Sequence, residues 1–144
     1  MEKQIFVNLP VTDLSRSIAF YEALGFVNLP QFTDETAAAL QWSDTIIVMV
    51  LTHEKWRTFT SRDIPDARKS AQMMLAISLP SRDEVDAITH RAGASGGTSD
   101  VNPIQEHGFM YGRDFEDPDG HVWEAFWMDP KFAQGDPQPE AEGA

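Results

Sequence analysis

"VNLPVTDLSRSIAFYEALGF" (residues 7–26) decides the fold, because it carries a strand, a helix start and a helix stop in that order. The apolar opening favours a short strand, and Asp13 has a side chain suited to a helix N-cap. Gly25 suits the left-handed turn that ends many helices. Between them, apolar residues recur at helical spacing at Leu14, Ile18 and Tyr21. The stretch therefore predicts a strand followed by one amphipathic helix.

The same order of signals returns 68 residues later, where Ser81 takes the place of Asp13. Ser81 and Glu84 have the spacing of a capping box, in which the two side chains satisfy free backbone donors at the helix start. Gly93 stands where Gly25 stands in the first copy. The apolar stripe of this helix consists of Val85, Ile88 and Ala92. This internal repeat predicts two related halves.

Strand-like stretches follow each helix, at 26–32, 37–42 and 45–52 in the first half and at 108–115 and 121–128 in the second. Ser43-Asp44 and Asp117-Pro-Asp-Gly120 have the composition of hairpin turns. Each half is therefore predicted to have the order β-α-β-β-β. We expect an α+β fold of two tandem βαβββ modules, which form a curved mixed sheet around a central pocket.

The predicted boundaries give a single domain over 1–131. Module one covers about 4–54, the linker 55–71 is an ordered loop with some helix, and module two covers 72–130. The tail 132–144 is rich in Pro, Gly, Glu and Ala, and we expect it to be disordered.

Composition restricts the class of protein. The net charge of −12 argues against a nucleic-acid partner, because phosphate binding needs clustered Lys and Arg. The chain has no cysteine and no long apolar run, so we expect a cytoplasmic protein that neither carries disulfides nor enters a membrane.

Glu124 stands out because it interrupts the predicted strand 121–128, which is apolar on both faces. A carboxylate in such a place loses solvation worth several kcal/mol unless a partner replaces the water. That partner could be a metal, an arginine, a proton or a ligand. The alternatives without function are a structural ion pair and a strand end exposed to water.

The repeat indicates which residues face Glu124. Aligning 45–51 with 120–126 makes Met49 its counterpart, and the offset of 68 makes Phe6 the counterpart of Met74. Asn8 shares a strand face with Phe6 and should also point into the pocket. The apolar positions would line an adaptable cavity, since methionine fits irregular shapes.

Several stretches of the sequence resemble the vicinal oxygen chelate superfamily. Its members include glyoxalase I, extradiol dioxygenases, fosfomycin resistance enzymes and bleomycin resistance proteins. The resemblance lies in "VNLPVTDLSRSIAFYEALGF" and "DPDGHVWE", and it covers roughly residues 4–130. "QFTDE", "HGFMYGR" and "WEAFWMD" resemble the bacterial group described as predicted lactoylglutathione lyases.

The resemblance implies four metal-ligand positions, which hold His, Gln or Glu in metal-using members. Carried over, they fall on Phe6, Met49, Met74 and Glu124, of which only Glu124 matches. Methionine sulfur is too soft for ions such as Mg²⁺ or Mn²⁺. We therefore expect no metal at this site and no other cofactor. A relocated metal site using His107 and Glu124 remains an alternative.

The strand 108–115 should pair beside Glu124. The turn at 117–120 would place either Arg113 or Gly112 directly across from it. Arg113 would give a charge-assisted ion pair, whereas Gly112 would leave room for a ligand. Tyr111 shares a face with Arg113, and its hydroxyl could serve the core or the pocket.

Three functions are consistent with this pattern. The first is a metal-independent protein that binds a small, partly apolar molecule through Glu124, Asn8 and either Arg113 or His107. The second is a lyase or isomerase of the glyoxalase type, less readily a dioxygenase, with Glu124 as general base. The third is an interaction module without a ligand. The resemblance also implies a homodimer.

Overall fold

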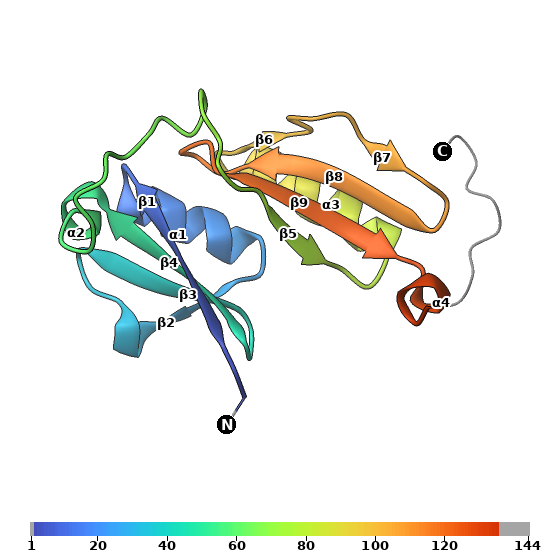
Figure 1. The fold of residues 1–144 in the computed structure, drawn as a ribbon, viewed down its shortest axis with the longest axis horizontal. Helices are drawn as coiled ribbons and strands as arrows, with labels where there is room; N and C mark the ends of the chain where they lie inside the picture. The colour runs from blue at the N-terminus through green and yellow to red at the C-terminus, as the bar shows by residue number, and fades with distance from the viewer. Residues whose placement is uncertain (1, 136–144) are drawn as a thin grey trace. The chain divides into compact units, whose positions relative to one another are not determined.

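The protein, represented by a computed structural model, is described over residues 2–135 and divides into two units, Met1–Ser70 and Ala71–Ala144. The elements of the N-terminal unit are β1 (Ile5–Val11), α1 (Leu14–Ala23), β2 (Val27–Leu29), the 3₁₀ turn η1 (Pro30–Phe32), β3 (Ala37–Ser43), β4 (Ile46–Thr52) and α2 (His53–Trp56) (Figure 1).

Helix α1 begins and ends where the sequence predicts. The Asp13 carboxylate accepts a hydrogen bond from the backbone N–H of Arg16 at 3.1 Å, which satisfies one free donor of the first turn. Gly25 follows the helix with φ of 104°, a left-handed value that glycine adopts without strain. The predicted strand 26–32 is shorter than expected, because Pro30 begins the turn η1.

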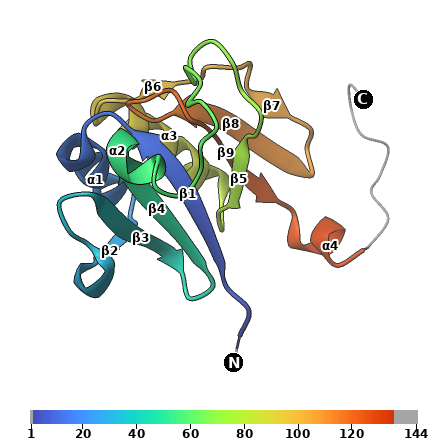
Figure 2. The same ribbon diagram turned by 60° about the vertical axis from the view of Figure 1, so that its left-hand side comes forward.

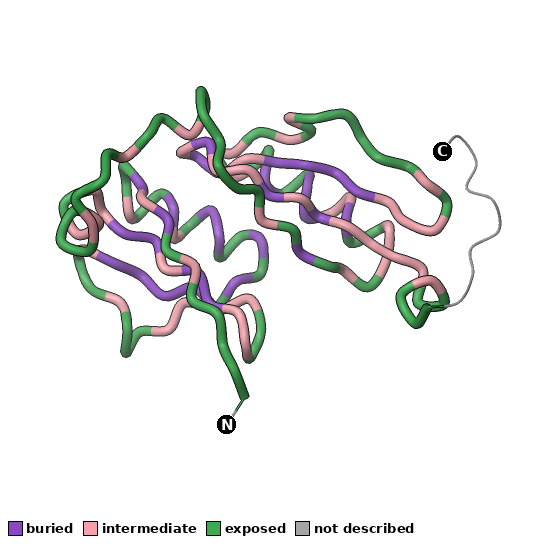
Figure 3. The backbone as a smooth tube through the Cα atoms, viewed as in Figure 1, coloured by how far each residue is buried: buried purple, intermediate pink, exposed green. Residues whose placement is uncertain are grey.

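The sheet of the N-terminal unit has the order β1-β4-β3-β2, in which β1 and β4 are parallel and the other pairs are antiparallel. Helix α1 packs on β3 and β4, and α2 contacts β1 and β4 (Figure 2). Buried residues concentrate in β3 and β4 (Figure 3). One sheet face carries six residues that are at most 2% exposed: Leu9, Val11, Ala38, Leu40, Val48 and Val50.

The C-terminal unit repeats this plan with additions. Its elements are β5 (Leu75–Ser78), α3 (Arg82–Ala94), β6 (Thr98–Ser99), β7 (Gln105–Glu106), β8 (Met110–Glu116), β9 (Val122–Met128) and α4 (Pro130–Ala133). The sheet order is β5-β9-β8-β6, and the short β7 also pairs with β8. Both units therefore contain the predicted βαβββ pattern, and the α+β fold is confirmed.

Helix α3 starts at the predicted cap, where the Ser81 hydroxyl accepts from the N–H of Glu84 at 3.2 Å. The predicted stripe of Val85, Ile88 and Ala92 is buried. The predicted stop at Gly93 is wrong, because the helix continues to Ala94 and the left-handed turn lies at Gly96 with φ of 104°. Gly93 instead gives space to Ser99, whose Oγ would lie 2.4 Å from an added Cβ.

The predicted C-terminal tail, 132–144, differs from the prediction at its first residues. Phe132 and Ala133 belong to α4, although the sequence places them in the tail. The rest of the predicted disordered tail, from 136 onwards, lies outside the described residues. Among the described helices, none is both long enough and apolar enough to span a membrane.

Candidate functional site

Glu124 lies beside a second carboxylate. Strands β8 and β9 are antiparallel, and their register pairs Asp114 with Glu124 and Arg113 with Ala125. Residues paired in this way point to the same sheet face. The prediction that Arg113 or Gly112 lies across from Glu124 is therefore wrong.

The connection between the strands explains this register. Strand β8 ends at Glu116 and β9 begins at Val122, which leaves a five-residue loop instead of a tight turn. Asp117 closes the loop, because its N–H donates to the carbonyl of His121 at 3.0 Å and its carboxylate accepts from the N–H of His121 at 2.9 Å. A loop that is one residue longer than the predicted turn shifts the pairing of the two strands by one residue. Asp114 therefore takes the place of Arg113 as the partner of Glu124.

The two carboxylates differ in their surroundings. Asp114 is only 7% exposed, and its Oδ2 accepts a hydrogen bond from Nδ2 of Asn102 at 2.7 Å. Glu124 is half-buried, and among the described residues its carboxylate has neither a hydrogen-bond partner nor an ion-pair partner. Burial raises the pKa of Glu124, and the nearby charge of Asp114 raises it further.

The strand face around Glu124 combines apolar residues with two further carboxylates, Asp114 and Glu116 of β8. The register places Val122 and Phe126 on the same face of β9, two residues to either side of Glu124. Ala76 of β5 is paired with Glu124, and Gly112 of β8 is paired with Phe126. The small size of these partners leaves Glu124 and Phe126 with little side-chain cover from the neighbouring strands. We call this set, with Asp114, the Glu124 face.

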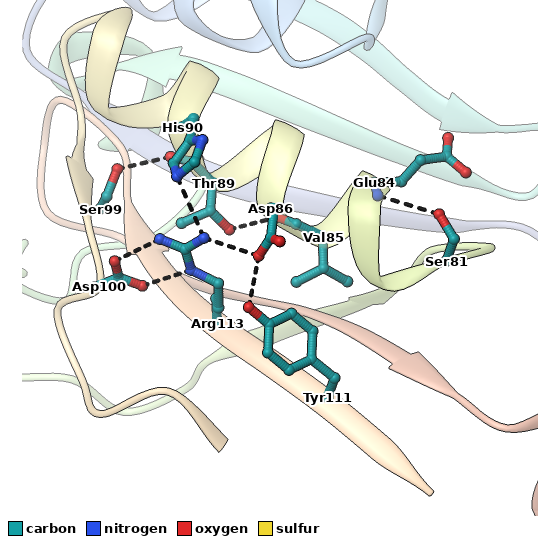
Figure 4. A network of polar contacts seen from close by, with 10 residues as sticks. All are labelled: Ser81, Glu84, Val85, Asp86, Thr89, His90, Ser99, Asp100, Tyr111 and Arg113. Carbon is teal, nitrogen blue, oxygen red and sulfur yellow. Dashed lines mark hydrogen bonds and ion pairs between the residues drawn. The ribbon is translucent and has the colours of Figure 1, made fainter. Parts of the chain in front are cut away.

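Tyr111 and Arg113 lie on the opposite sheet face, against α3 (Figure 4). The Arg113 guanidinium donates to both oxygens of Asp100, at 2.9 and 2.7 Å, and to Asp86 of α3 at 2.9 Å. The Tyr111 hydroxyl also donates to Asp86, at 2.6 Å. The guanidinium nitrogen lies 3.4 Å from Nε2 of His90. Arg113 therefore links β8 to α3 and does not form an ion pair with Glu124.

The predicted site residues of the N-terminal unit share one sheet face. Asn8 of β1 is paired with Met49 of β4, and Phe6 lies two residues before Asn8. Phe6 is 50% exposed and Met49 is half-buried. Met74 lies just before β5, so it is outside the strand, and it is 62% exposed. The shared pocket expected between the halves remains a prediction.

His107 lies at a different end of its sheet from Glu124. Its N–H donates to the carbonyl of Met110, and Met110 is paired with Met128. Met128 lies four positions after Glu124 along β9, which is roughly 13 Å at about 3.3 Å per residue. The imidazole stacks on Phe109, whose ring contacts Phe132 of α4.

These residues do not fit the metal site of metal-using relatives. Phe6 has no lone pair, two other positions are methionines, and only Glu124 offers a hard donor. Within residues 2–135, no cluster of three or more His, Cys, Asp or Glu side chains could hold an ion.

Asp114 and Asn102 are not among the site residues that the sequence predicts. The missing signal was the loop length between β8 and β9, since extending the loop by one residue exchanges Arg113 for Asp114. Asn102 lies in the irregular segment between β6 and β7, where neither strand nor helix periodicity predicts a position.

Comparisons with known proteins agree with this architecture. The family model described as "Glyoxalase/Bleomycin resistance protein/Dioxygenase superfamily" matches residues 3–125. A hypothetical protein, SA1046, from S. aureus has a similar structure, with a TM-score of 0.73, 23% identity, and coverage of 88% of this chain and 95% of that one. A family enzyme from Burkholderia phytofirmans PsJN gives a TM-score of 0.74 at 17% identity, with coverage of 88% and 99%.

A bleomycin resistance determinant encoded on the transposon Tn5 is also similar, with a TM-score of 0.59, 19% identity, and coverage of 89% and 99%. At these identities the likeness shows the fold alone. No curated protein matches the chain. The family model spans most of the sequence, and the βαβββ pattern occurs in both units. The chain therefore belongs to the glyoxalase/bleomycin resistance protein/dioxygenase superfamily.

Proposed function

We propose that this protein binds a small, partly apolar molecule on the Glu124 face, without the divalent ion of metal-using superfamily members. The observation that carries the proposal is the half-buried carboxylate of Glu124, which has no hydrogen-bond or ion-pair partner among the described residues. A buried charge without a partner is costly, and a ligand that supplies one recovers that cost.

The surroundings of Glu124 indicate the chemistry of the ligand. Asp114 adds a second negative charge, so a cationic group or a strong hydrogen-bond donor is favoured next to the pair. Val122 and Phe126 offer apolar contact on either side. A small arylalkylamine combines both properties.

A thermal-shift comparison tests this function. Arylalkylamines are paired with analogues in which a hydroxyl replaces the amine, and each is added to the natural protein, to Glu124→Gln and to the control Glu22→Gln, which changes an exposed residue of α1. The amines should raise the melting temperature of the natural protein and the control, but not of Glu124→Gln. An equal rise in Glu124→Gln, or no rise with any compound, contradicts the proposal. Stoichiometric metal in the purified protein contradicts its metal-free part.

The second candidate is a lyase or isomerase of the glyoxalase type, for which the lactoylglutathione lyase resemblance is the starting point. The raised pKa of Glu124 favours it, because a general base works best when its pKa approaches the working pH. Glu124 would remove a proton next to a substrate carbonyl. With an active substrate, Glu124→Gln should abolish turnover and retain binding, and unchanged turnover excludes this role.

We also propose that the protein forms a homodimer, as the family resemblance implies. Five large apolar side chains of the N-terminal unit are about half exposed or more: Ile5, Phe6, Val27, Phe32 and Phe59. An interface would remove them from water. Light scattering on the purified protein gives the mass, and a monomer at all concentrations contradicts the dimer.

A further inference from the structure

Positive charge is concentrated in one segment of this acidic chain, residues 55–69. This basic segment holds five of the eleven Lys and Arg residues and only two acidic ones, which gives it a net charge of +3. The rest of the chain carries six basic and twenty-one acidic residues, a net charge of −15. The segment begins in the second half of α2, in the N-terminal unit, and is mostly exposed (Figure 3).

The basic segment contains a hollow of about 450 Å³, a volume within the range of small-molecule sites. Its lining consists of Arg57, Thr60, Ser61, Arg62, Asp63 and Ile64. Two arginines and one aspartate are therefore among the residues that line this hollow. Among the described residues, neither Arg57 nor Arg62 has an ion-pair partner.

The backbone of the segment is held by consecutive turns. The N–H of Arg57 donates to the carbonyl of His53 at 3.0 Å, and the N–H of Thr60 donates to the carbonyl of Trp56 at 3.3 Å. The Thr60 hydroxyl oxygen accepts from the N–H of Arg62 at 3.3 Å, which leaves its proton available to a ligand. Because these hydrogen bonds already fix the backbone, the segment loses less conformational entropy when a ligand binds.

The geometry points to a second binding site in this hollow, which takes a small molecule bearing a phosphate group and is separate from the Glu124 face. Arginine presents a planar fork of donors that matches phosphate oxygens in two-point contacts. The hydroxyls of Thr60 and Ser61 add uncharged donors. A small ligand is favoured over a polyanion, because the net charge of −15 on the rest of the chain repels a long charged strand.

Titration with sodium pyrophosphate, followed by amide chemical shifts at constant ionic strength, tests this site. The amides of 57–64 should shift and saturate. Arg57→Gln and Arg62→Gln should each weaken binding about tenfold, since each removes a charged two-point contact. Asp63→Asn should tighten binding, because it removes the one repelling charge of the lining. Arg91→Gln, a change of an exposed arginine on α3, is the matched control and should leave binding unchanged.

Two results overturn the proposal in different ways. If the shifts do not saturate, or if Arg91→Gln weakens binding as much as Arg57→Gln, the effect is nonspecific attraction. A short oligothymidylate serves as the second probe. If it binds through Arg57 and Arg62 more tightly than pyrophosphate, the partner is a nucleic acid and the small-molecule assignment is wrong. All variants change exposed side chains, and circular dichroism verifies their folding.

Discussion

At the scale of single residues, Glu124 decides the functional account. The sequence predicts that a carboxylate within an apolar strand needs a partner, and the structure shows Asp114 beside it instead of a cation. Two carboxylates on one sheet face repel each other, and burial strengthens that repulsion. Glu124 is therefore a group whose charge destabilises the folded protein in the absence of a ligand.

Glu124→Gln should stabilise the protein in a pH-dependent way. The raised pKa means that the folded state binds this proton more tightly than the unfolded state, so the wild-type protein loses stability as the pH rises from about 4.3 through the raised value. The variant should be the more stable at pH 7, and the difference should vanish below about pH 4. Urea unfolding across this range measures it, with Glu22→Gln as the control that should change little.

Ser17→Ala should also stabilise the protein, by about 1 kcal/mol. Ser17 lies in α1 with no exposed surface, and within residues 2–135 its hydroxyl has no hydrogen-bond partner. Alanine removes that unsatisfied group and has the higher helix propensity. Denaturant unfolding at pH 7 measures the change, and a loss of stability means that the hydroxyl has a partner in solution.

At the scale of elements, polar contacts attach α3 to its sheet. Arg113 of β8 bonds to Asp86 of α3 and to Asp100, the residue after β6. It is 8% exposed, so no water can replace these contacts easily. Asp100 adopts a left-handed φ of 57°, which aspartate tolerates better than most residues.

Arg113→Met should lower the free energy of unfolding by roughly 2–4 kcal/mol at pH 7, because it leaves two partly exposed carboxylates without their partner. Hydrogen bonds from Arg113 lower the pKa of Asp100, and those from Tyr111 and then Arg113 lower that of Asp86. The contribution is therefore present above about pH 4 and lost as the pH falls through the lowered values. Urea unfolding at pH 7 and pH 3 should show the difference shrinking, and a constant difference would falsify the ion-pair explanation.

Gly93 and Ser99 should show energetic coupling. An added Cβ at Gly93 meets Ser99 Oγ, which donates to the carbonyl of Thr89 at 2.7 Å, so the serine would have to give up that bond. Gly93→Ala should therefore be more favourable by about 1–2 kcal/mol when Ser99→Ala is also present. A double-mutant cycle of unfolding free energies measures this, and additive effects would exclude the contact.

At the scale of the whole molecule, the repeat made the fold predictable. The caps at Asp13 and Ser81 are local, so the sequence alone locates them. The hairpin turn predicted at 43–44 lies one residue later, at 44–45, because Ser43 still belongs to β3 and pairs with Ile46. The sequence alone does not locate the pairing partner of Glu124. A difference of one residue in the length of the loop between β8 and β9 changes which residue lies across from it. The predicted helix stop at Gly93 is wrong for a related reason. Helix α3 is longer than α1, so the constant offset of 68 residues no longer holds at its end.

The titration of Glu124 itself tests the central claim most directly. Carboxyl-carbon NMR of the natural protein is recorded across pH, alone and saturated with an arylalkylamine. Glu124 should titrate at a higher pH than glutamate does in an unstructured peptide, and the bound amine should move its titration to lower pH. If Glu124 titrates as glutamate does in an unstructured peptide and no amine moves it, the carboxylate is solvated and the Glu124 face is not a ligand site.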